Sequence, residues 1–217
     1  MTPGAAVRAN GPAERFAAAL AVLGGGLILV WPAALNGYPI LFSDTGAFLH
    51  QTTGPLMIWD KPWIYGPMLL LGHWHVSLWA AVIGQGVVLS HLLFLTGRAV
   101  RTGATPVWHL GLCLFAALVT SAPWATALLM PDILAAATVL SLWLLGFARE
   151  RLTWAESWWV GGLGALAIAA HVEVVFTATL PCRDDGDFIT IDGDAHVGGC
   201  DRRIGEDAEL GRAAGPV

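Results

Sequence analysis

Charged residues are scarce in this chain. Asp, Glu, Lys and Arg make up 12% of its 217 residues, whereas ordinary soluble domains contain about 25%. Hydrophobic residues make up 56%, and the mean hydropathy is +0.64. A soluble core of this size cannot bury so much apolar surface. The composition therefore argues against an ordinary soluble domain and predicts an all-α, polytopic transmembrane helix bundle.

Several chemical motifs are also absent. The three cysteines form no Cys-x-x-Cys pair and have no cysteine–histidine ligand spacing, and His73 and His75 lack a third ligand, so no metal site is predicted. The phosphate-binding pattern Gly-x-x-x-x-Gly-Lys-Ser/Thr does not occur either. No cofactor and no nucleic-acid partner is expected. Any group-transfer reaction would need a donor that comes from the membrane.

The few charges are unevenly distributed. Residues 1–171 carry seven basic and six acidic residues, whereas residues 172–217 carry four basic and ten acidic ones. All 11 tryptophans precede position 160. We therefore expect three parts: a cytoplasmic lead (1–15), a transmembrane bundle (16–180) and an acidic tail (181–217).

The acidic tail has two interpretations. It shows neither a helical nor a strand period, which is typical of a disordered extracytoplasmic segment. The abrupt change after His171 is equally what a shifted reading frame would produce. Cys182 and Cys200 flank an acidic stretch and are a possible disulfide pair outside the cytoplasm. Cys113 lies in an apolar run and is expected to be a small core residue.

Apolar runs predict about five membrane spans. The first run holds 20 residues without a charge, enough to cross about 30 Å of hydrocarbon as a helix. A later run of 34 residues is too long for one span and is interrupted by Gly72 and His73. The spans are expected over Phe16–Leu35, Val76–Leu95, two segments of Pro106–Phe147 joined by a tight turn, and Trp158–Ala170, with a short re-entrant or interfacial helix over Trp63–Leu71.

Basic residues fix the expected orientation, because loops on the cytoplasmic side of a membrane carry an excess of Lys and Arg. Six arginines fall on one side of these spans and only Lys61 falls on the other. The N-terminus is therefore expected in the cytoplasm, and the protein in the cytoplasmic (inner) membrane. The Asn36–Lys61 loop and the Ser121–Asp132 turn then face outward.

Asp44 and Asp132 are the candidate catalytic residues. Each lies beside the outer end of a predicted span, where acids are scarce, because residues 1–171 hold only six. Each also has a simpler structural interpretation. Ser43 or Asp44 is placed to cap a following helix, and Asp132 follows Pro131, where a carboxylate favours the positive end of a helix dipole.

Three residues near Asp44 are candidate substrate-binding groups. Lys61 is the natural contact for a phosphate, and the alternative is a lysine that extends its ammonium group from the end of a span into the headgroup region. His50 lies in the same loop, and Tyr65 follows shortly after it. We expect these side chains to surround a substrate at the outer membrane surface.

Three motifs resemble a known family: Asn36-Gly37-Tyr38-Pro39 with Ser43-Asp44-Thr45-Gly46, Asp60-Lys61-Pro62 with Tyr65-Gly66, and Ser121-Ala122-Pro123-Trp124 with Met130-Pro131-Asp132-Ile133. They resemble a group of uncharacterised bacterial multi-pass membrane proteins, which in turn look like the C-type glycosyltransferases that use polyprenyl-phosphate sugars. The resemblance covers about residues 15–171. It implies that the acid of the first outward loop, here Asp44, acts as a base or positions the acceptor. Asp132 matches a second acid by position only.

The resemblance also implies more spans than this chain shows, and often a periplasmic domain, so the chain is expected to be a fragment with its C-terminal part missing or frame-shifted. The expected function is that of a glycosyltransferase-like protein whose partners are membrane lipid and a polyprenyl-phosphate sugar donor. Asp44 would accept the proton of an acceptor hydroxyl. The alternative is a non-catalytic membrane protein, either a transporter fragment or a structural subunit.

Overall fold

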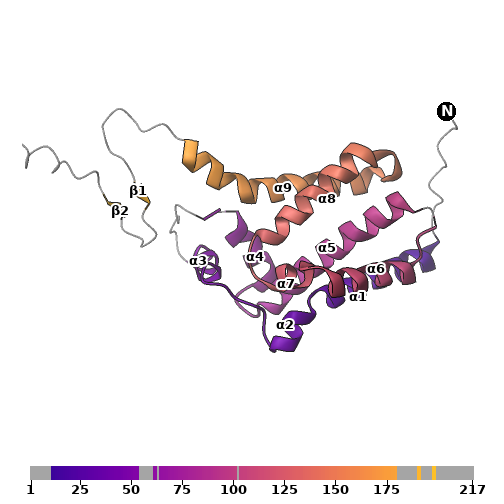
Figure 1. The fold of residues 1–217 in the computed structure, drawn as a ribbon, viewed down its shortest axis with the longest axis horizontal. Coiled ribbons are helices and arrows are strands. Elements are labelled where there is room, and N and C mark those ends of the chain that lie inside the picture. Colours follow the sequence, from indigo (N-terminus) through magenta and orange to yellow (C-terminus); the bar gives the residue numbers. More distant parts are fainter. Residues whose placement is uncertain are drawn as a thin grey trace, which may run out of the picture. The chain divides into compact units, whose positions relative to one another are not determined.

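The structure is a computed structural model, which describes residues 11–53, 61–62, 64–101 and 103–179 and two short strands (Figure 1). Side chains are described as far as Ala170. The chain divides into two compact units, Met1–Thr177 and Ala178–Val217. In the second unit β1 (Thr190–Ile191) pairs antiparallel with β2 (Val197–Gly198). The predictions about Cys182, Cys200 and the nature of the tail otherwise lie outside the described residues.

Helices make up the first unit, which confirms the all-α prediction for its described part. A one-residue parallel bridge is the only strand pairing described in it. The helices are α1 (Pro12–Leu29), α2 (Trp31–Asn36), α3 (Thr45–His50), α4 (Tyr65–His73), α5 (Trp79–Val100), α6 (Pro106–Val119), α7 (Ala122–Ala127), α8 (Asp132–Phe147), the 3-10 turn η1 (Arg149–Arg151) and α9 (Trp154–Thr179).

The first apolar run is not one continuous helix, so the prediction of a single helix over Phe16–Leu35 is wrong. α1 ends at Leu29, and α2 begins at Trp31 after Val30 leaves the helical conformation, with φ −102° and ψ 14°. Pro32 explains the break, because it has no N–H to donate and its ring clashes with the carbonyl four residues earlier.

The second apolar run forms two helices, as predicted, although both boundaries lie further along the chain. α4 replaces the helix expected over Trp63–Leu71, and α5 replaces the span expected over Val76–Leu95. The break between them falls at Trp74 and His75, which adopt left-handed backbone conformations with φ 42° and 57°.

The third run gives α6 and α8, but no tight turn joins them. They have 14 and 16 residues, and the short helix α7 lies between them. α9 begins four residues earlier than expected and continues past His171 to Thr179. The change of composition at His171 therefore does not end the helix.

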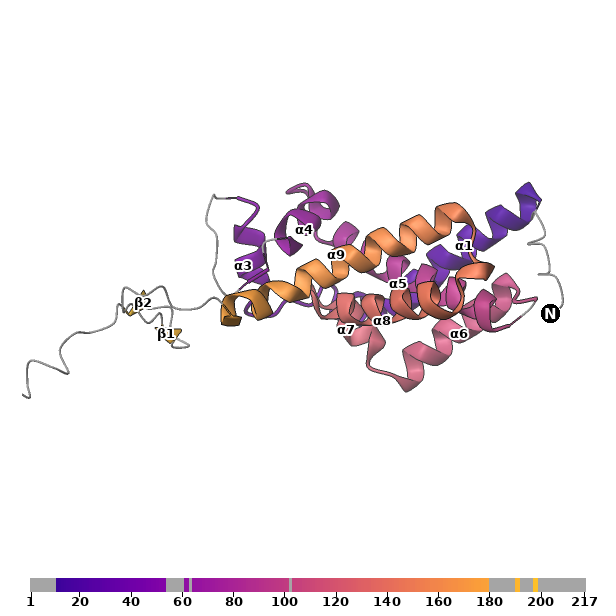
Figure 2. The same cartoon turned by 90° about the horizontal axis from the view of Figure 1, so that it is seen from above.

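α1 packs against α5 and α6, and the two views show the three helices side by side (Figures 1 and 2). The backbones of α1 and α5 come close together at Gly26 and Gly86. A Cβ on Gly86 would lie 2.6 Å from the Gly26 carbonyl oxygen, and one on Gly26 would lie 2.9 Å from the Val87 nitrogen. Such backbone-to-backbone crossings at small residues are typical of helices that pack within membranes.

Among the described residues, two helices are long and apolar enough to cross a membrane, α1 and α5. This is a test of length and composition. α1 lies near the N-terminus, where a signal sequence has the same character, and half of the α5 window is buried, as in the core helix of a soluble protein. α6 and α8 are shorter apolar helices.

Candidate functional site

Two loops that are far apart in the sequence meet at one end of the first unit. The Ile40 N–H donates to the Ala127 carbonyl (3.1 Å), and the Leu129 N–H donates to the Ile40 carbonyl (3.1 Å). The buried Thr45 hydroxyl donates to the Leu129 carbonyl at 3.0 Å. The Asn36–Lys61 and Ser121–Asp132 segments, which the sequence places on the same side, are therefore joined through their backbones.

Asp44 forms an ion pair with Lys61, with Nζ and Oδ2 2.7 Å apart. The Asp44 side chain is 34% exposed and the Lys61 side chain is 19% exposed. The pair is therefore partly buried but still accessible to solvent. Asp44 does stand at the N-cap of α3, but its side chain makes no capping hydrogen bond there. Its carboxylate is directed to Lys61 instead, and the Thr45 hydroxyl organises the turn by accepting from the Phe42 N–H at 2.9 Å.

Tyr65 begins α4 and is fully buried, with its ring edge-on to Phe48 at a centroid distance of 4.9 Å. The Gln85 amide nitrogen donates to the Tyr65 hydroxyl (3.3 Å) and to the Met130 carbonyl (3.4 Å). Burial raises the pKa of Tyr65, and the nearby Asp132 carboxylate raises it further. Tyr65 thus links the Asp132 region to α5, and a ligand would have to displace neighbours to touch it.

Asp132 is the first residue of α8 and is exposed. Its position in the first helical turn is electrostatically favourable. No direct contact between Asp44 and Asp132 is found in the part of the chain that the structure describes, although both belong to the joined loops. His50, the last residue of α3, is exposed. The structure therefore brings Asp44 and Lys61 together.

Two buried glutamines near this end are not among the candidate site residues chosen from the sequence. Gln85 and Gln51 are almost fully buried, and within the described residues the Gln85 Oε1 and both amide atoms of Gln51 have no hydrogen-bond partner. Gln51 packs against Gly66, where a Cβ would lie 2.6 Å from its Oε1. For Gln85 the available signal was an amide within the otherwise apolar helix α5, since polar side chains in such helices usually face other helices.

An ion pair joins the C-terminal end of α5 to the N-terminal end of α9. The Arg98 guanidinium donates two hydrogen bonds to Glu156, at 2.7 and 3.2 Å, and the Arg151 guanidinium donates to the Ala99 carbonyl. Burial alone would raise the pKa of Glu156, but hydrogen bonds from Arg98 and Thr153 outweigh it and hold the pKa below its usual value. The arginine-rich loops that the sequence places on one side therefore also meet.

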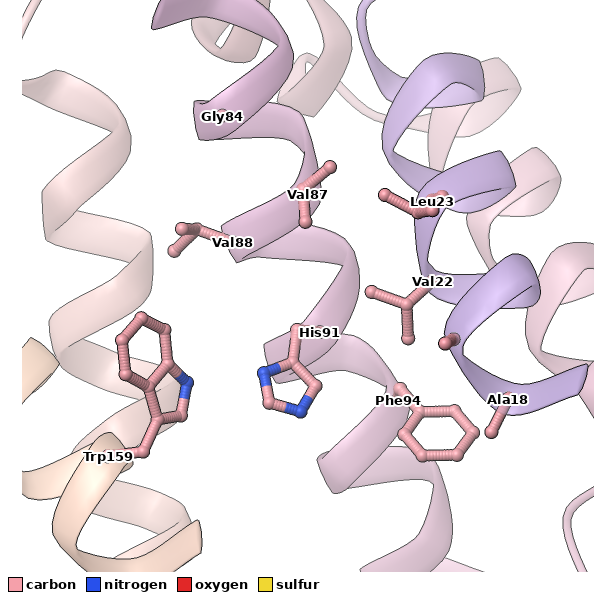
Figure 3. A pocket seen from close by; sticks show the side chains of 10 residues that line it. Ala18, Val22, Leu23, Gly84, Val87, Val88, His91, Phe94 and Trp159 are labelled. Atoms are coloured by element: carbon pink, nitrogen blue, oxygen red, sulfur yellow. The ribbon is translucent and has the colours of Figure 1, made fainter. Parts of the chain in front are cut away.

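A cavity of about 600 Å³ lies between α1, α5 and α9 (Figure 3). Its walls are apolar except for His91, which the close view places between Trp159 and Phe94, and the His91 and Trp159 ring centroids are 6.3 Å apart. None of the five candidate site residues lines this cavity. It is an apolar groove separate from the Asp44–Lys61 pair.

Comparison with protein families, with characterised proteins and with solved structures finds no match for this chain. The resemblance to the C-type glycosyltransferases therefore depends on the sequence motifs alone.

Proposed function

We propose that the protein is an integral protein of the cytoplasmic membrane, with its N-terminus in the cytoplasm and about five spans contributed by α1, α5, α6, α8 and α9. The distribution of side chains supports this proposal. On α1, one face holds large apolar residues that are 49–67% exposed: Phe16, Leu20, Leu23 and Leu27. Polar Ser90 and His109 are instead buried between helices. Water disfavours a large exposed apolar face, whereas lipid favours it.

We propose further that the end containing Asp44 transfers a sugar from a polyprenyl-phosphate donor at the outer membrane surface. The observation that carries this proposal is the contact between Asp44 and Lys61. The acceptor hydroxyl attacks the anomeric carbon of the donor sugar and loses its proton to the Asp44 carboxylate. The bond between that carbon and the phosphate oxygen breaks, and the Lys61 ammonium offsets the charge of the departing polyprenyl phosphate.

In this proposal the Asp44–Lys61 ion pair is the state of the site before substrate binds. With no substrate bound, Lys61 is occupied by Asp44. A phosphate that takes over Lys61 would release the Asp44 carboxylate to act as a base. Asp132 lies on the joined loop, where it would orient the acceptor, and membrane lipid surrounds the helices. His50 and Tyr65 are proposed as further contacts, of which Tyr65 requires local opening.

Transfer in vesicles tests the proposal. The chain is reconstituted into lipid vesicles with a radiolabelled polyprenyl-phosphate hexose, and sugar transfer is measured for the unmodified chain, Asp44→Asn, Asp132→Asn and Lys61→Ala. Loss of a general base typically costs about 10²–10⁴-fold in rate, so Asp44→Asn should lose that much. Asp132→Asn should lose less, and Lys61→Ala should mainly raise the KM for the donor. Unchanged transfer by Asp44→Asn would exclude the base role.

A non-catalytic role, as a structural subunit or part of a transporter, is the rival proposal. The observation in its favour is that these contacts also have a purely structural use: the Asp44–Lys61 pair closes the Asn36–Lys61 loop on itself, and the Thr45–Leu129 hydrogen bond fastens this loop to the Ser121–Asp132 segment. A partly exposed ion pair contributes only about 0.2–1 kcal/mol, so Asp44→Asn should leave the melting temperature nearly unchanged. No detectable transfer by a well-folded unmodified chain would favour this rival.

A further inference from the structure

A second cavity, of about 290 Å³, lies between the segment that follows α3 and the segment that ends α4. Its polar lining residues are Tyr38, Thr52, Thr53, His73, His75 and Ser77. Asp44, at the other end of α3, does not line it. Its volume is at the lower limit of about 300 Å³ for ligand pockets, so it has room for one small molecule.

His73, which lines this cavity, carries a hydrogen-bond donor that has no partner among the described residues. The side chain is 5% exposed, and its Nδ1 accepts the backbone N–H of His75 at 2.9 Å. Burial and the neighbouring His75 both lower the pKa of His73, so the ring is neutral at pH 7. Because Nδ1 is the acceptor, the proton of the neutral ring must be on Nε2. That Nε2–H has no partner among the described residues.

The backbone holds this arrangement in place. Trp74 and His75 both adopt the left-handed region, which is uncommon for residues other than glycine. The conformation directs the His75 N–H onto the His73 ring, and the Val76 N–H donates to the His73 carbonyl at 2.7 Å. The orientation of the His73 ring is thus fixed without using its second nitrogen.

The hydroxyl groups that line the cavity include both hydrogen-bond acceptors and a hydrogen-bond donor. Thr52 and Thr53 donate their protons to the Leu49 and His50 carbonyls, at 2.6 and 3.1 Å, so their oxygens are left as acceptors. Ser77 accepts the Trp79 N–H at 3.3 Å, which leaves its proton available. The described residues that line the cavity include no Asp, Glu, Lys or Arg. The walls therefore present both donors and acceptors but no compensating charge.

We propose that this cavity is a binding site for a small uncharged ligand that carries several hydroxyl groups, with one ligand oxygen accepting the His73 Nε2–H. A hydroxyl group suits these walls because it accepts from His73 and donates to Thr52 or Thr53. An anion would enter without a cation to balance it, and a hydrocarbon would leave the His73 donor unpaired. The site stands independently of sugar transfer at Asp44.

Nuclear magnetic resonance of the purified full chain in detergent micelles, with histidines labelled in their ring nitrogens, tests the site. myo-Inositol is the probe, because it is an uncharged ring with six hydroxyls. Cyclohexanol, the same ring with one hydroxyl, is the ligand control. We expect a saturable shift of the His73 Nε2 resonance with myo-inositol, and at least about tenfold weaker binding of cyclohexanol.

Variants complete the test. His73→Phe keeps a planar ring but removes the donor, and it should weaken myo-inositol binding about tenfold or more, measured by calorimetry. His91→Phe makes the same replacement outside this cavity and should bind as the unmodified chain does. Thr53→Val is a milder change that should also weaken binding. It provides the test in case His73→Phe does not fold. Equal binding of the two ring compounds, no saturable shift, or unchanged affinity in both His73→Phe and Thr53→Val would overturn the proposal.

Discussion

Gly25 shows how one absent side chain sets the spacing of three helices. It faces a buried cluster formed by Ser90 of α5 with His109 and Cys113 of α6. The Ser90 hydroxyl donates to the Val22 carbonyl of α1 at 2.8 Å and lies 3.0 Å from the His109 Nε2. Since the serine proton is used, Ser90 accepts from His109. The prediction that Cys113 is a core residue is confirmed, because its side chain is fully buried.

Gly25→Ala should therefore destabilise the protein. A Cβ at this position would lie 2.5 Å from the Ser90 Oγ and 2.7 Å from the Cys113 Sγ. Overpacking of this kind costs about 1–3 kcal/mol, which exceeds the gain of about 1 kcal/mol that alanine brings to a helix interior. Thermal unfolding in micelles measures the change. Gly111→Ala on α6 meets no atom within 4 Å and should raise the melting temperature. A similar rise for Gly25→Ala would refute the packing argument.

The start of α9 is stabilised by interactions within the helix and with α5. The Thr153 N–H donates to Glu156 at 2.8 Å, and the Glu156 N–H donates to the Thr153 hydroxyl at 3.3 Å, which forms a reciprocal capping box. Arg98 then binds the same carboxylate. Because this cap precedes the first predicted apolar residue of the span, α9 begins earlier than hydropathy alone indicates.

This cap should make the stability of the protein depend on pH. Hydrogen bonds from Arg98 and Thr153 hold the pKa of Glu156 below its usual value, so its contribution to stability is complete above the unfolded pKa and is lost as pH falls through the folded pKa. Glu156→Gln should lower the melting temperature at pH 7, and the difference from the unmodified chain should shrink below about pH 4.5. Glu150→Gln, at an exposed position, is the control. A difference that stays constant as the pH falls below about 4.5 would contradict the linkage.

The whole first unit has two chemically different ends. One holds the Ile40–Leu128 bridge and the Asp44–Lys61 pair. The other holds the Arg98–Glu156 contact. The positive-inside rule predicts that the arginine-rich end faces the cytoplasm.

Cysteine labelling in intact cells checks this orientation. In a background without the three native cysteines, an impermeant maleimide should label Ser43→Cys and should not label Glu150→Cys, since both positions are exposed but belong to opposite ends. Glu150→Cys should react once the cells are permeabilised. Labelling of Glu150→Cys alone in intact cells would invert the topology, and labelling of neither residue after permeabilisation would exclude the proposed exposure of both ends.

The sequence by itself determined the all-α class, the grouping of the loops and the position of Asp44 at the start of a helix. These features follow from hydropathy and from local turn residues such as Gly37, the left-handed C-cap of α2. Pro32 also indicates a helix break near Val30, but the continuous apolar run favoured a single span over this region.

Only the tertiary structure decided which polar groups meet. The Asp44–Lys61 pair joins residues 17 positions apart, and the Thr45–Leu129 hydrogen bond joins residues 84 apart. Neither spacing has a local signature, because such contacts depend on how helices cross. The burial of Tyr65 against Gln85 and the orientation of His73 have the same origin: a side chain's partners are set by packing in space, whereas its secondary structure is set largely by its neighbours in sequence.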